Sequence, residues 1–229
     1  MKIYFIRHGH PDYKHDCLTE LGEKQAKALA ERLTTSGIEH IFSSTNGRAF
    51  QTASYTAEKL NLEIVPCDFM RETPWKPLTD EPVPENGNPW LVSSLFVKEG
   101  KSLCDKDWVN KEPFCKTMIT ASSKHAYSKF DEVLADFGYQ REGEYYRVTR
   151  EDTDKTIAVF SHGGASSAVL SHMLNIPLPV FYGSLCMGCS SIIIVTLGNK
   201  YGELVCPKLN LFNDMAHAEG LTVENVYGI

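Results

Sequence analysis

Two histidines of this chain each follow directly on a short hydrophobic segment. His8 comes after the first such segment, beside Arg7, and His162 comes after another one far downstream. Open α/β sheets carry their chemistry where buried strands of this kind end. An imidazole can act as a nucleophile, and an arginine offers a planar fork of donors to an anion. With Arg48 as a second arginine, the sequence predicts an anion pocket that contains an imidazole nucleophile.

The pattern of apolar residues predicts the elements that position these groups. Segments of strand character alternate with segments whose apolar residues recur at helical spacing, which favours a mostly parallel sheet with helices on both faces. The expected class is α/β, a three-layer α/β/α sandwich in one domain, residues 1–229. Strands are expected at 2–6, 41–42, 63–65, 145–148, 156–160, 191–197 and 203–205, and helices from Thr19 toward Gly37, from Asn46 to 60, at 121–137 and at 163–174.

Two expectations concern the connections between these elements. Residues 145–148 and 156–160 are predicted to form a hairpin or otherwise adjacent strands, joined by the charged turn at 150–155. Pro177 and Pro179 are expected to interrupt regular structure.

Five short motifs stand in a fixed order along the chain. They are Arg7-His8-Gly9; Leu18-Thr19-Glu20-Leu21-Gly22 with Gln25-Ala26; Ser43-Ser44 with Arg48-Ala49 and Gln51-Thr52-Ala53; Arg71-Glu72; and Ser161-His162-Gly163-Gly164. In this order they resemble the histidine phosphatase superfamily, in its phosphoglycerate mutase-like branch. The resemblance extends over residues 1–72 and 120–212, and it implies the same three-layer fold and a reaction at a phosphoryl group.

The resemblance also implies a role for each residue of these motifs. Phosphoryl transfer needs an in-line nucleophile and positive donors around the phosphoryl oxygens. His8 would attack phosphorus through one ring nitrogen while the other nitrogen donates to a backbone carbonyl. Arg7 and Arg48 would bind the phosphoryl group, and a protonated His162 would donate to it, beside the free N–H groups of a helix that opens at Gly163. Taken alone, Arg48 fits a solvated helix arginine equally well.

The family pattern places the general acid of the reaction at Glu72. Burial would raise the pKa of this carboxyl and keep it protonated near neutral pH; the alternative is a surface patch formed with Arg71. Residues 73–77 depart from the Trp-Glu-Gly that the family usually shows here. This departure bears both on the assignment of Glu72 as the acid and on the identity of the substrate. A second departure lies at residues 9–12. Either His10 and Asp12 line the mouth of the pocket, or His10 belongs with His15 and Asp16 to a solvated loop.

Residues 73–120 differ in composition from the rest of the chain. Six of the eleven prolines and all three tryptophans lie there, without clear periodicity. A long irregular connection is either functional or disordered, and tryptophans need burial, which argues against disorder. We therefore expect an inserted, irregular cap over the pocket; the alternative is a satellite subdomain packed elsewhere.

Charge and hydropathy exclude several classes of partner. The 23 basic and 29 acidic residues give a net charge of -6, so nothing favours nucleic acid. No apolar segment has the length of a membrane span. Seven cysteines without a disulfide framework are typical of a reducing compartment, so a cytoplasmic location is expected.

The remaining cysteine and histidine positions carry no further chemistry in this interpretation. The CxxC from Cys186 to Cys189 is ascribed to small residues before a buried strand rather than to zinc or redox chemistry. Core or surface roles are expected for His40, His125, His172 and His217. No motif for a metal or a nucleotide cofactor occurs, so no cofactor is expected.

The expected activity is metal-independent hydrolysis of a phosphomonoester through a phosphohistidine on His8. A phosphoglycerate-type mutase that uses the same site is the alternative, and a non-catalytic regulatory module on this fold is a third interpretation. A mutase protects its phosphoenzyme from water, so water exclusion separates the two enzymes. Because residues 73–140 contain no arginine, a small phosphorylated metabolite with an apolar or sugar-like body is expected. The sequence leaves a homodimer open.

Overall fold

A six-stranded sheet with the strand order β11-β9-β1-β8-β4-β5 forms the centre of the protein in a computed structural model that describes residues 1–221. The neighbours from β1 to β5 run parallel, whereas β9 is antiparallel to both β1 and β11. The mostly parallel sheet predicted from the sequence is thereby confirmed. Its strands are β1 (Lys2–Arg7), β4 (His40–Ser44), β5 (Ile64–Cys67), β8 (Thr156–Ser161), β9 (Ile192–Thr196) and β11 (Lys208–Asp214).

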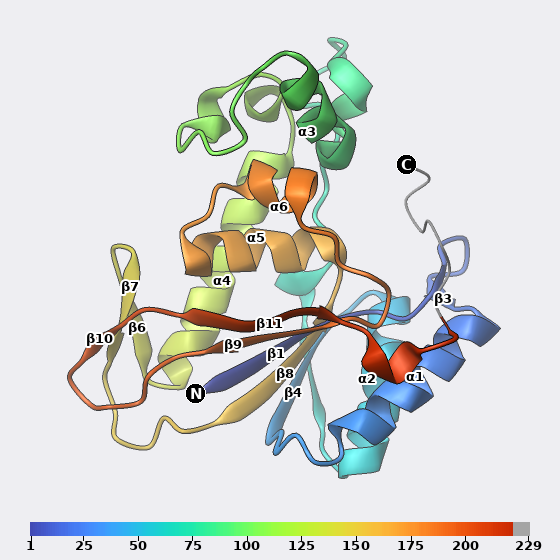
Figure 1. Ribbon diagram of the computed structural model, residues 1–229, viewed down its shortest axis with the longest axis vertical. Helices are drawn as coiled ribbons and strands as arrows, with labels where there is room; N and C mark the ends of the chain where they lie inside the picture. Colours follow the sequence, from blue (N-terminus) through green and yellow to red (C-terminus); the bar gives the residue numbers. More distant parts are fainter. Residues whose placement is uncertain (222–229) are drawn as a thin grey trace.

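Helices cover both faces of this sheet (Figure 1). Side chains of β1 alternate between the two faces, as a strand requires. Tyr4 and Ile6 pack in one core with α1 and α2, while Ile3 and Phe5 pack in a second core with α4 and α5. The three-layer architecture is confirmed. The four helices span Glu20–Leu33 (α1), Gly47–Leu60 (α2), Ile119–Asp136 (α4) and Gly163–Leu174 (α5).

Local signals set where α1 and α2 begin. Thr19 caps α1, because its hydroxyl accepts a hydrogen bond from the N–H of Gly22 at 3.2 Å. Asn46 occupies the corresponding position before α2, but its side chain makes no capping bond. The carboxylate of Asp16 does so instead, accepting from the N–H of Gly47 at 2.8 Å. A loop distant in sequence therefore determines the start of α2.

The strand at Tyr145–Val148 (β7) lies in a second sheet, so the prediction that it neighbours residues 156–160 is wrong. β8 is buried over almost its whole length and lies between β1 and β4, whereas β7 alternates between exposed and buried residues. A half-exposed strand suits a small antiparallel sheet with one solvated face. β7 accordingly pairs with β6 (Tyr139–Glu142) and β10 (Leu204–Val205). A two-stranded ribbon, β2 (Pro11–Asp12) with β3 (Cys17–Leu18), precedes α1.

The segment between β5 and α4 is more regular than the sequence predicts. It contains α3 (Pro89–Lys98), which begins where the side chain of Asn88 accepts a hydrogen bond from the N–H of Trp90 at 3.1 Å. A proline in the first turn costs no hydrogen bond. The same reason explains α6 (Leu178–Ser184), which begins at Pro177 and Pro179. Regular structure is interrupted before these prolines, where α5 ends, as the sequence predicts, but the further helix that they begin was not expected. Short 3-10 turns lie at η1 (Asp68–Met70), η2 (Pro84–Gly87), η3 (Trp108–Asn110), η4 (Phe114–Lys116) and η5 (Ala216–Ala218).

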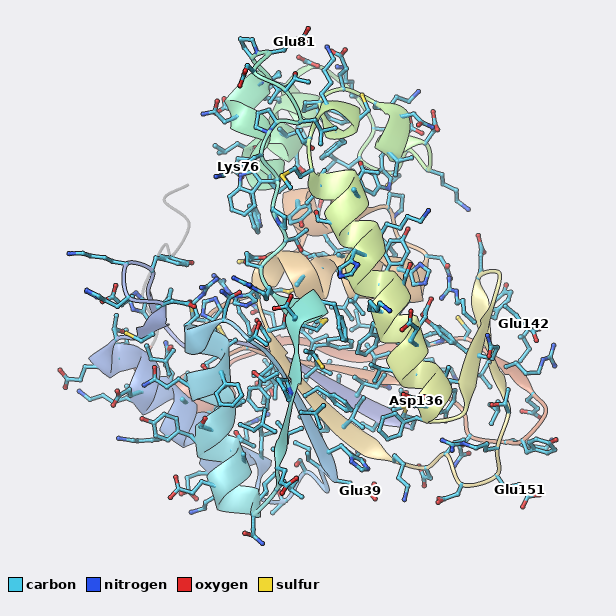
Figure 2. All side chains as sticks on the ribbon, turned by 180° about the vertical axis from the view of Figure 1, so that it is seen from behind. Glu39, Lys76, Glu81, Asp136, Glu142 and Glu151 are labelled. Atoms are coloured by element: carbon cyan, nitrogen blue, oxygen red, sulfur yellow. The ribbon has the colours of Figure 1, made fainter. Side chains whose placement is uncertain are left out.

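Residues 73–118 lie above the sheet, on the side of α5 and α6 (Figure 1). α3 packs against α6, and Trp75, Trp90 and Trp108 join the edge of the core that also holds α4 and α5. Seen from behind, α4 runs from this segment, near Lys76, down to Asp136 beside the small sheet (Figure 2). The tryptophans are thus packed against the core, in agreement with the prediction that this segment is ordered.

Candidate active site

The two histidines singled out from the sequence lie side by side at the carboxyl ends of parallel strands. His8 follows β1 and His162 follows β8, and these strands pair in register from Lys2 and Thr156 to Arg7 and Ser161. The imidazole centroids are 5.1 Å apart, with the ring planes inclined by 60°. Both side chains are buried, with 1% and 0% exposure. The sheet topology therefore brings together residues 154 positions apart in the chain.

The hydrogen bonds of His8 fix its tautomer. Its Nδ1 lies 2.7 Å from the carbonyl oxygen of Gly9, so Nδ1 carries the proton and donates it. Arg48 donates from Nε to Nε2 of His8 at 3.3 Å. Burial lowers the pKa of His8 well below its ordinary value, and the positive charges of Arg7 and Arg48 act in the same direction. His8 is therefore a neutral imidazole with its lone pair on Nε2.

Arg48 lies between the two imidazoles and is held by a carboxylate. Besides its bond to His8, it donates from a terminal nitrogen to Nδ1 of His162 at 3.0 Å. Its other terminal nitrogen forms an ion pair with Asp16, and its side chain is 9% exposed. A solvated helix arginine, the alternative left open by the sequence, is not what the structure contains. The Asp16 carboxylate, which sequence reasoning treated as part of a solvated loop, is the group that orients Arg48.

The protonation of His162 differs from the sequence expectation. Because Arg48 donates to Nδ1, the ring proton lies on Nε2, which is 2.8 Å from the hydroxyl of Ser44. Burial lowers the pKa of His162 well below its ordinary value, followed by the effects of His8 and the surrounding arginines. His162 is thus a neutral donor toward Ser44, and not the protonated group expected.

Arg7 is buried beside the histidines. The side chain is 4% exposed and donates to the carbonyl oxygen of Met187 at 2.5 Å. Its charge depresses the pKa of both imidazoles and also acts on Glu72. The loop that carries Met187 therefore holds one of the two cations of the site.

Glu72 reaches the start of α5, next to the histidines. A methyl group on Gly164 would collide with a carboxyl oxygen of Glu72, so the two residues are in close contact. The same oxygen accepts a hydrogen bond from the N–H of Thr73 at 3.0 Å. Burial raises the pKa of Glu72, against the opposing effects of Arg7 and Arg48, which favours the protonated acid. Arg71 does not pair with it; its guanidinium lies 3.6 Å from Asp68.

Other residues of the sequence motifs support the loops around the site. The N–H of Gly9 donates to the hydroxyl of Thr52 at 3.0 Å, and the N–H of His10 donates to the side chain of Gln25 at 2.7 Å. The N–H of Leu18 donates to the side chain of Gln51 at 2.8 Å. These polar residues therefore fix the backbone that follows His8.

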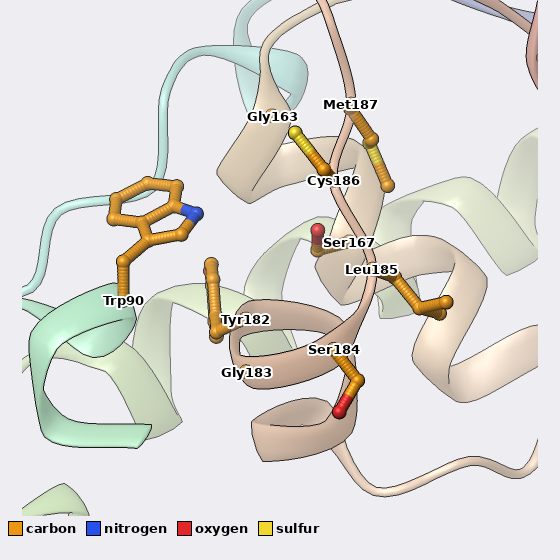
Figure 3. A pocket seen from close by; sticks show the side chains of 9 residues that line it. All are labelled: Trp90, Gly163, Ser167, Tyr182, Gly183, Ser184, Leu185, Cys186 and Met187. Atoms are coloured by element: carbon orange, nitrogen blue, oxygen red, sulfur yellow. The ribbon is translucent and has the colours of Figure 1, made fainter. Parts of the chain in front are cut away.

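A cavity of about 200 Å³ lies beside the start of α5 and the loop that carries Met187 (Figure 3). Gly163, at the start of α5, and Met187, whose carbonyl holds Arg7, both belong to its wall. Trp90 is the residue of the segment 73–118 that lines the same cavity. The tryptophan content of that segment could have suggested such a role but could not place the residue. The full lining is Trp90, Gly163, Ser167, Tyr182, Gly183, Ser184, Leu185, Cys186 and Met187.

Two structural findings concern metal binding and membrane spans. Within residues 1–221, no three His, Cys, Asp or Glu side chains are grouped so as to hold a metal ion. In the same range, no helix combines the length and the apolar composition needed to cross a bilayer.

Comparison with known sequences identifies the family. The profile of the histidine phosphatase superfamily (branch 1) matches residues 3–99. A protein named probable phosphoglycerate mutase GpmB, from Yersinia pseudotuberculosis, is 33% identical over 186 residues, covering 77% of this chain and 76% of the relative. A protein of the same name from Yersinia enterocolitica is 30% identical over 186 residues, covering 77% of this chain and 76% of the relative. The chain belongs to branch 1 of the histidine phosphatase superfamily.

Solved structures share the fold over nearly the whole chain. Mycobacterial glucosyl-3-phosphoglycerate phosphatase, in complex with inorganic phosphate, has a TM-score of 0.64 and 22% identity, covering 94% of this chain and 98% of that one. Phosphoserine phosphatase from Entamoeba histolytica, a mutant in complex with phosphoserine, has a TM-score of 0.61 and 18% identity with the same coverage. These likenesses concern the fold, and both neighbours are phosphatases of small phosphorylated metabolites.

Proposed function

We propose that this protein is a phosphomonoester hydrolase that passes through a phosphohistidine on His8. The observation that carries the proposal is the neutral tautomer of His8, whose Nε2 accepts from the buried Arg48, with Arg7 as a second buried cation near the ring. Nε2 is the atom that can attack phosphorus, because Nδ1 is committed to the carbonyl of Gly9. Arg7, Arg48 and the N–H groups at Gly163 would surround the phosphoryl oxygens.

In the first step, a bond forms between Nε2 of His8 and phosphorus while the bond from phosphorus to the leaving oxygen breaks. Glu72 gives its proton to that oxygen, so an alcohol leaves. In the second step, water attacks the phosphorus of the phosphohistidine on His8. The bond to Nε2 breaks, its electron pair returns to the ring, and the Glu72 carboxylate takes the proton of the water. Inorganic phosphate is released and both residues regain their initial states.

His162 would serve this reaction as a donor to the phosphoryl oxygens. In the structure its Nδ1 accepts from Arg48 and its Nε2 donates to Ser44. A phosphoryl dianion would compete with His162 for the N–H of Arg48 and with Ser44 for the Nε2–H of His162. It would also raise the pKa of His162, because a nearby negative charge favours the imidazolium. The protonated donor expected from the sequence is therefore proposed for the ligand-bound state.

Hydrolysis is favoured over mutase activity by the surroundings of the site. The sequence relatives described above are named probable phosphoglycerate mutase, whereas the two structural neighbours are phosphatases. A glycerate carboxylate requires a cation besides those that hold the phosphoryl group, and the lining of the cavity provides none. We further propose that residues 73–120 cap the pocket, since Trp90 forms part of its wall.

The test is phosphate release from an aryl phosphate in the presence of a chelator. The wild-type protein should hydrolyse the aryl phosphate, and His8→Ala should not. His40→Ala is the matched control, because His40 is exposed at the opposite end of β4. Rapid quenching should trap acid-labile, base-stable phosphate on the wild-type chain and none on His8→Ala. Unchanged turnover in His8→Ala would remove the nucleophile assignment, and efficient phosphoryl exchange between the two positions of a phosphoglycerate would favour the mutase.

A further inference from the structure

The cavity beside the catalytic histidines contains no charged side chain. None of its nine lining residues is a lysine, arginine, histidine, aspartate or glutamate. Its one phenol, Tyr182, is buried, and burial raises the pKa of that phenol well above its ordinary value, with the Glu72 carboxylate acting in the same direction. The wall therefore consists of neutral groups.

Three contacts connect this cavity to the reacting groups. Gly163 directly follows His162, and Met187 accepts the hydrogen bond from Arg7. The hydroxyl of Tyr182 and a carboxyl oxygen of Glu72 both lie against Gly164. Because the proposed acid protonates the leaving oxygen, the part of the substrate that leaves must pass close to this wall.

The wall is mostly apolar and is packed from both sides. Figure 3 shows Trp90 of the insertion across from the loop that carries Leu185 and Met187. The Trp90 ring packs edge to face on Tyr182, with centroids 4.9 Å apart, and on Trp75 at 5.4 Å. Aromatic rings packed edge to face hold one another in position and offer apolar surface. The hydroxyls of Ser167 and Ser184 are among the neutral polar groups of the lining.

The arginines around the site are committed to other groups. Arg7 and Arg48 face the phosphoryl position in the proposed function. Arg71 lines a different cavity, of about 390 Å³, together with Glu72; this cavity shares no residue with the first, and the exposed guanidinium of Arg71 lies 3.6 Å from Asp68. A carboxylate held in the first cavity would thus lose water without gaining a cation from its lining, which is unfavourable.

We infer that the cavity selects phosphomonoesters whose alcohol part is uncharged, such as polyol or aryl phosphates, against phosphorylated hydroxy acids and amino acids. The inference rests on the proposed hydrolase function and deepens it. It names a substrate class by what the wall accepts: apolar contact from Trp90 and Leu185, and hydroxyl groups opposite Ser167 and Ser184.

The test compares pairs of esters in which one member carries a carboxylate on the alcohol part and the other carries an uncharged group there. Racemic glycerol 3-phosphate and racemic 3-phosphoglycerate form one pair, and phenyl phosphate and 4-carboxyphenyl phosphate form the other. We expect kcat/KM to be at least about tenfold higher for the uncharged member of each pair, which corresponds to ~1.4 kcal/mol of discrimination. A ratio of one or less in both pairs would overturn the inference, while turnover of phenyl phosphate would still support the proposed hydrolase. If no ester is turned over, phenyl phosphate included, both are wrong.

A variant of the wall gives an independent result. Leu185→Arg should narrow the ratio in both pairs by raising kcat/KM for the carboxylates, because it supplies the missing cation. Leu185→Gln is the control of similar length without charge and should leave the ratio near its wild-type value. The melting temperature of each variant establishes that it is folded. A folded Leu185→Arg protein with an unchanged ratio would show that the body of the substrate lies elsewhere and would overturn the inference.

Discussion

The carboxylate of Asp16 forms an ion pair with Arg48 and also accepts a hydrogen bond from the N–H of Gly47 at 2.8 Å. Arg48 in turn donates to both imidazoles of the site. Asp16 has a φ of 49°, in the left-handed region that aspartate adopts more readily than most residues. One loop residue therefore fixes both the start of α2 and the arginine that this helix carries.

Replacing Asp16 by asparagine should impair catalysis more than folding. We expect Asp16→Asn to lower kcat/KM for an aryl phosphate by about 10-fold to 100-fold, because a hydrogen bond between charged groups contributes ~1.5–3 kcal/mol. The amide oxygen can still accept from Gly47, so the melting temperature should change little. Asp12→Asn is the control, since Asp12 lies in the same loop and pairs with His15 at the surface. Equal losses in the two variants would contradict the orienting role of Asp16.

Gly164 is the residue that lets Glu72 approach the start of α5. Gly164→Ala would place a methyl group against the Glu72 carboxyl and against the Tyr182 hydroxyl, and it should displace the acid. We expect a rate loss of up to ~10²–10⁴ for alkyl phosphates, whose leaving oxygen needs a proton. For p-nitrophenyl phosphate, which has a good leaving group, the loss should be much smaller. Glu72→Gln should show the same dependence on the leaving group; if Gly164→Ala slows both substrates equally, it has disturbed phosphate binding instead.

The sequence predicted best those parts that follow from strand ends. His8 and His162 come at the ends of buried apolar strands, and parallel strands place such ends at one edge of a sheet. Asp16 was not predicted, because its contact with Arg48 depends on the fold of a loop for which no periodic pattern exists. The charge of His162 also could not be derived, since it depends on the burial of the ring and on the donation from Arg48 to one of its nitrogens.

The wrong and missing predictions about the fold have a common cause: the structure of a short segment depends on what surrounds it, which its own residues do not determine. Residues 145–148 and 156–160 both have strand character, and only their burial decides which sheet each joins. Pro177 is adjacent to a helix that it helps to begin, because a proline breaks helices only in their interior. β11 was not predicted, since polar residues interrupt its apolar ones and its burial is partial.

The pH dependence of activity should reflect two opposite pKa shifts. The pKa of His8 is lowered by burial, so the neutral nucleophile persists below the usual imidazole range, and the acid limb of kcat/KM should lie there. The pKa of Glu72 is raised by burial, so the alkaline limb should lie above the usual carboxyl range. The measurement is kcat/KM against pH for an alkyl phosphate, corrected for the second ionisation of the substrate near a pH of about 6. An alkaline limb that remains unchanged in Glu72→Gln would exclude Glu72 as its source.

The buried imidazoles should also make folding stability depend on pH. The folded-state pKa of His162 is lowered by burial and by His8, so below the ordinary imidazole pKa the unfolded chain binds a proton that the folded protein does not. Stability is therefore lost as pH falls through that range, by up to ~1.4 kcal/mol per pH unit for each such group. Glu72 acts in the opposite sense, because its raised pKa adds stability that is lost as pH rises through its folded-state value. We expect chemical denaturation between pH 7.5 and 5.5 to show a shallower loss of unfolding free energy for His162→Asn than for wild type, since Glu72 is common to both. Parallel pH profiles for the two proteins would show that His162 binds its proton equally well in the folded and unfolded states.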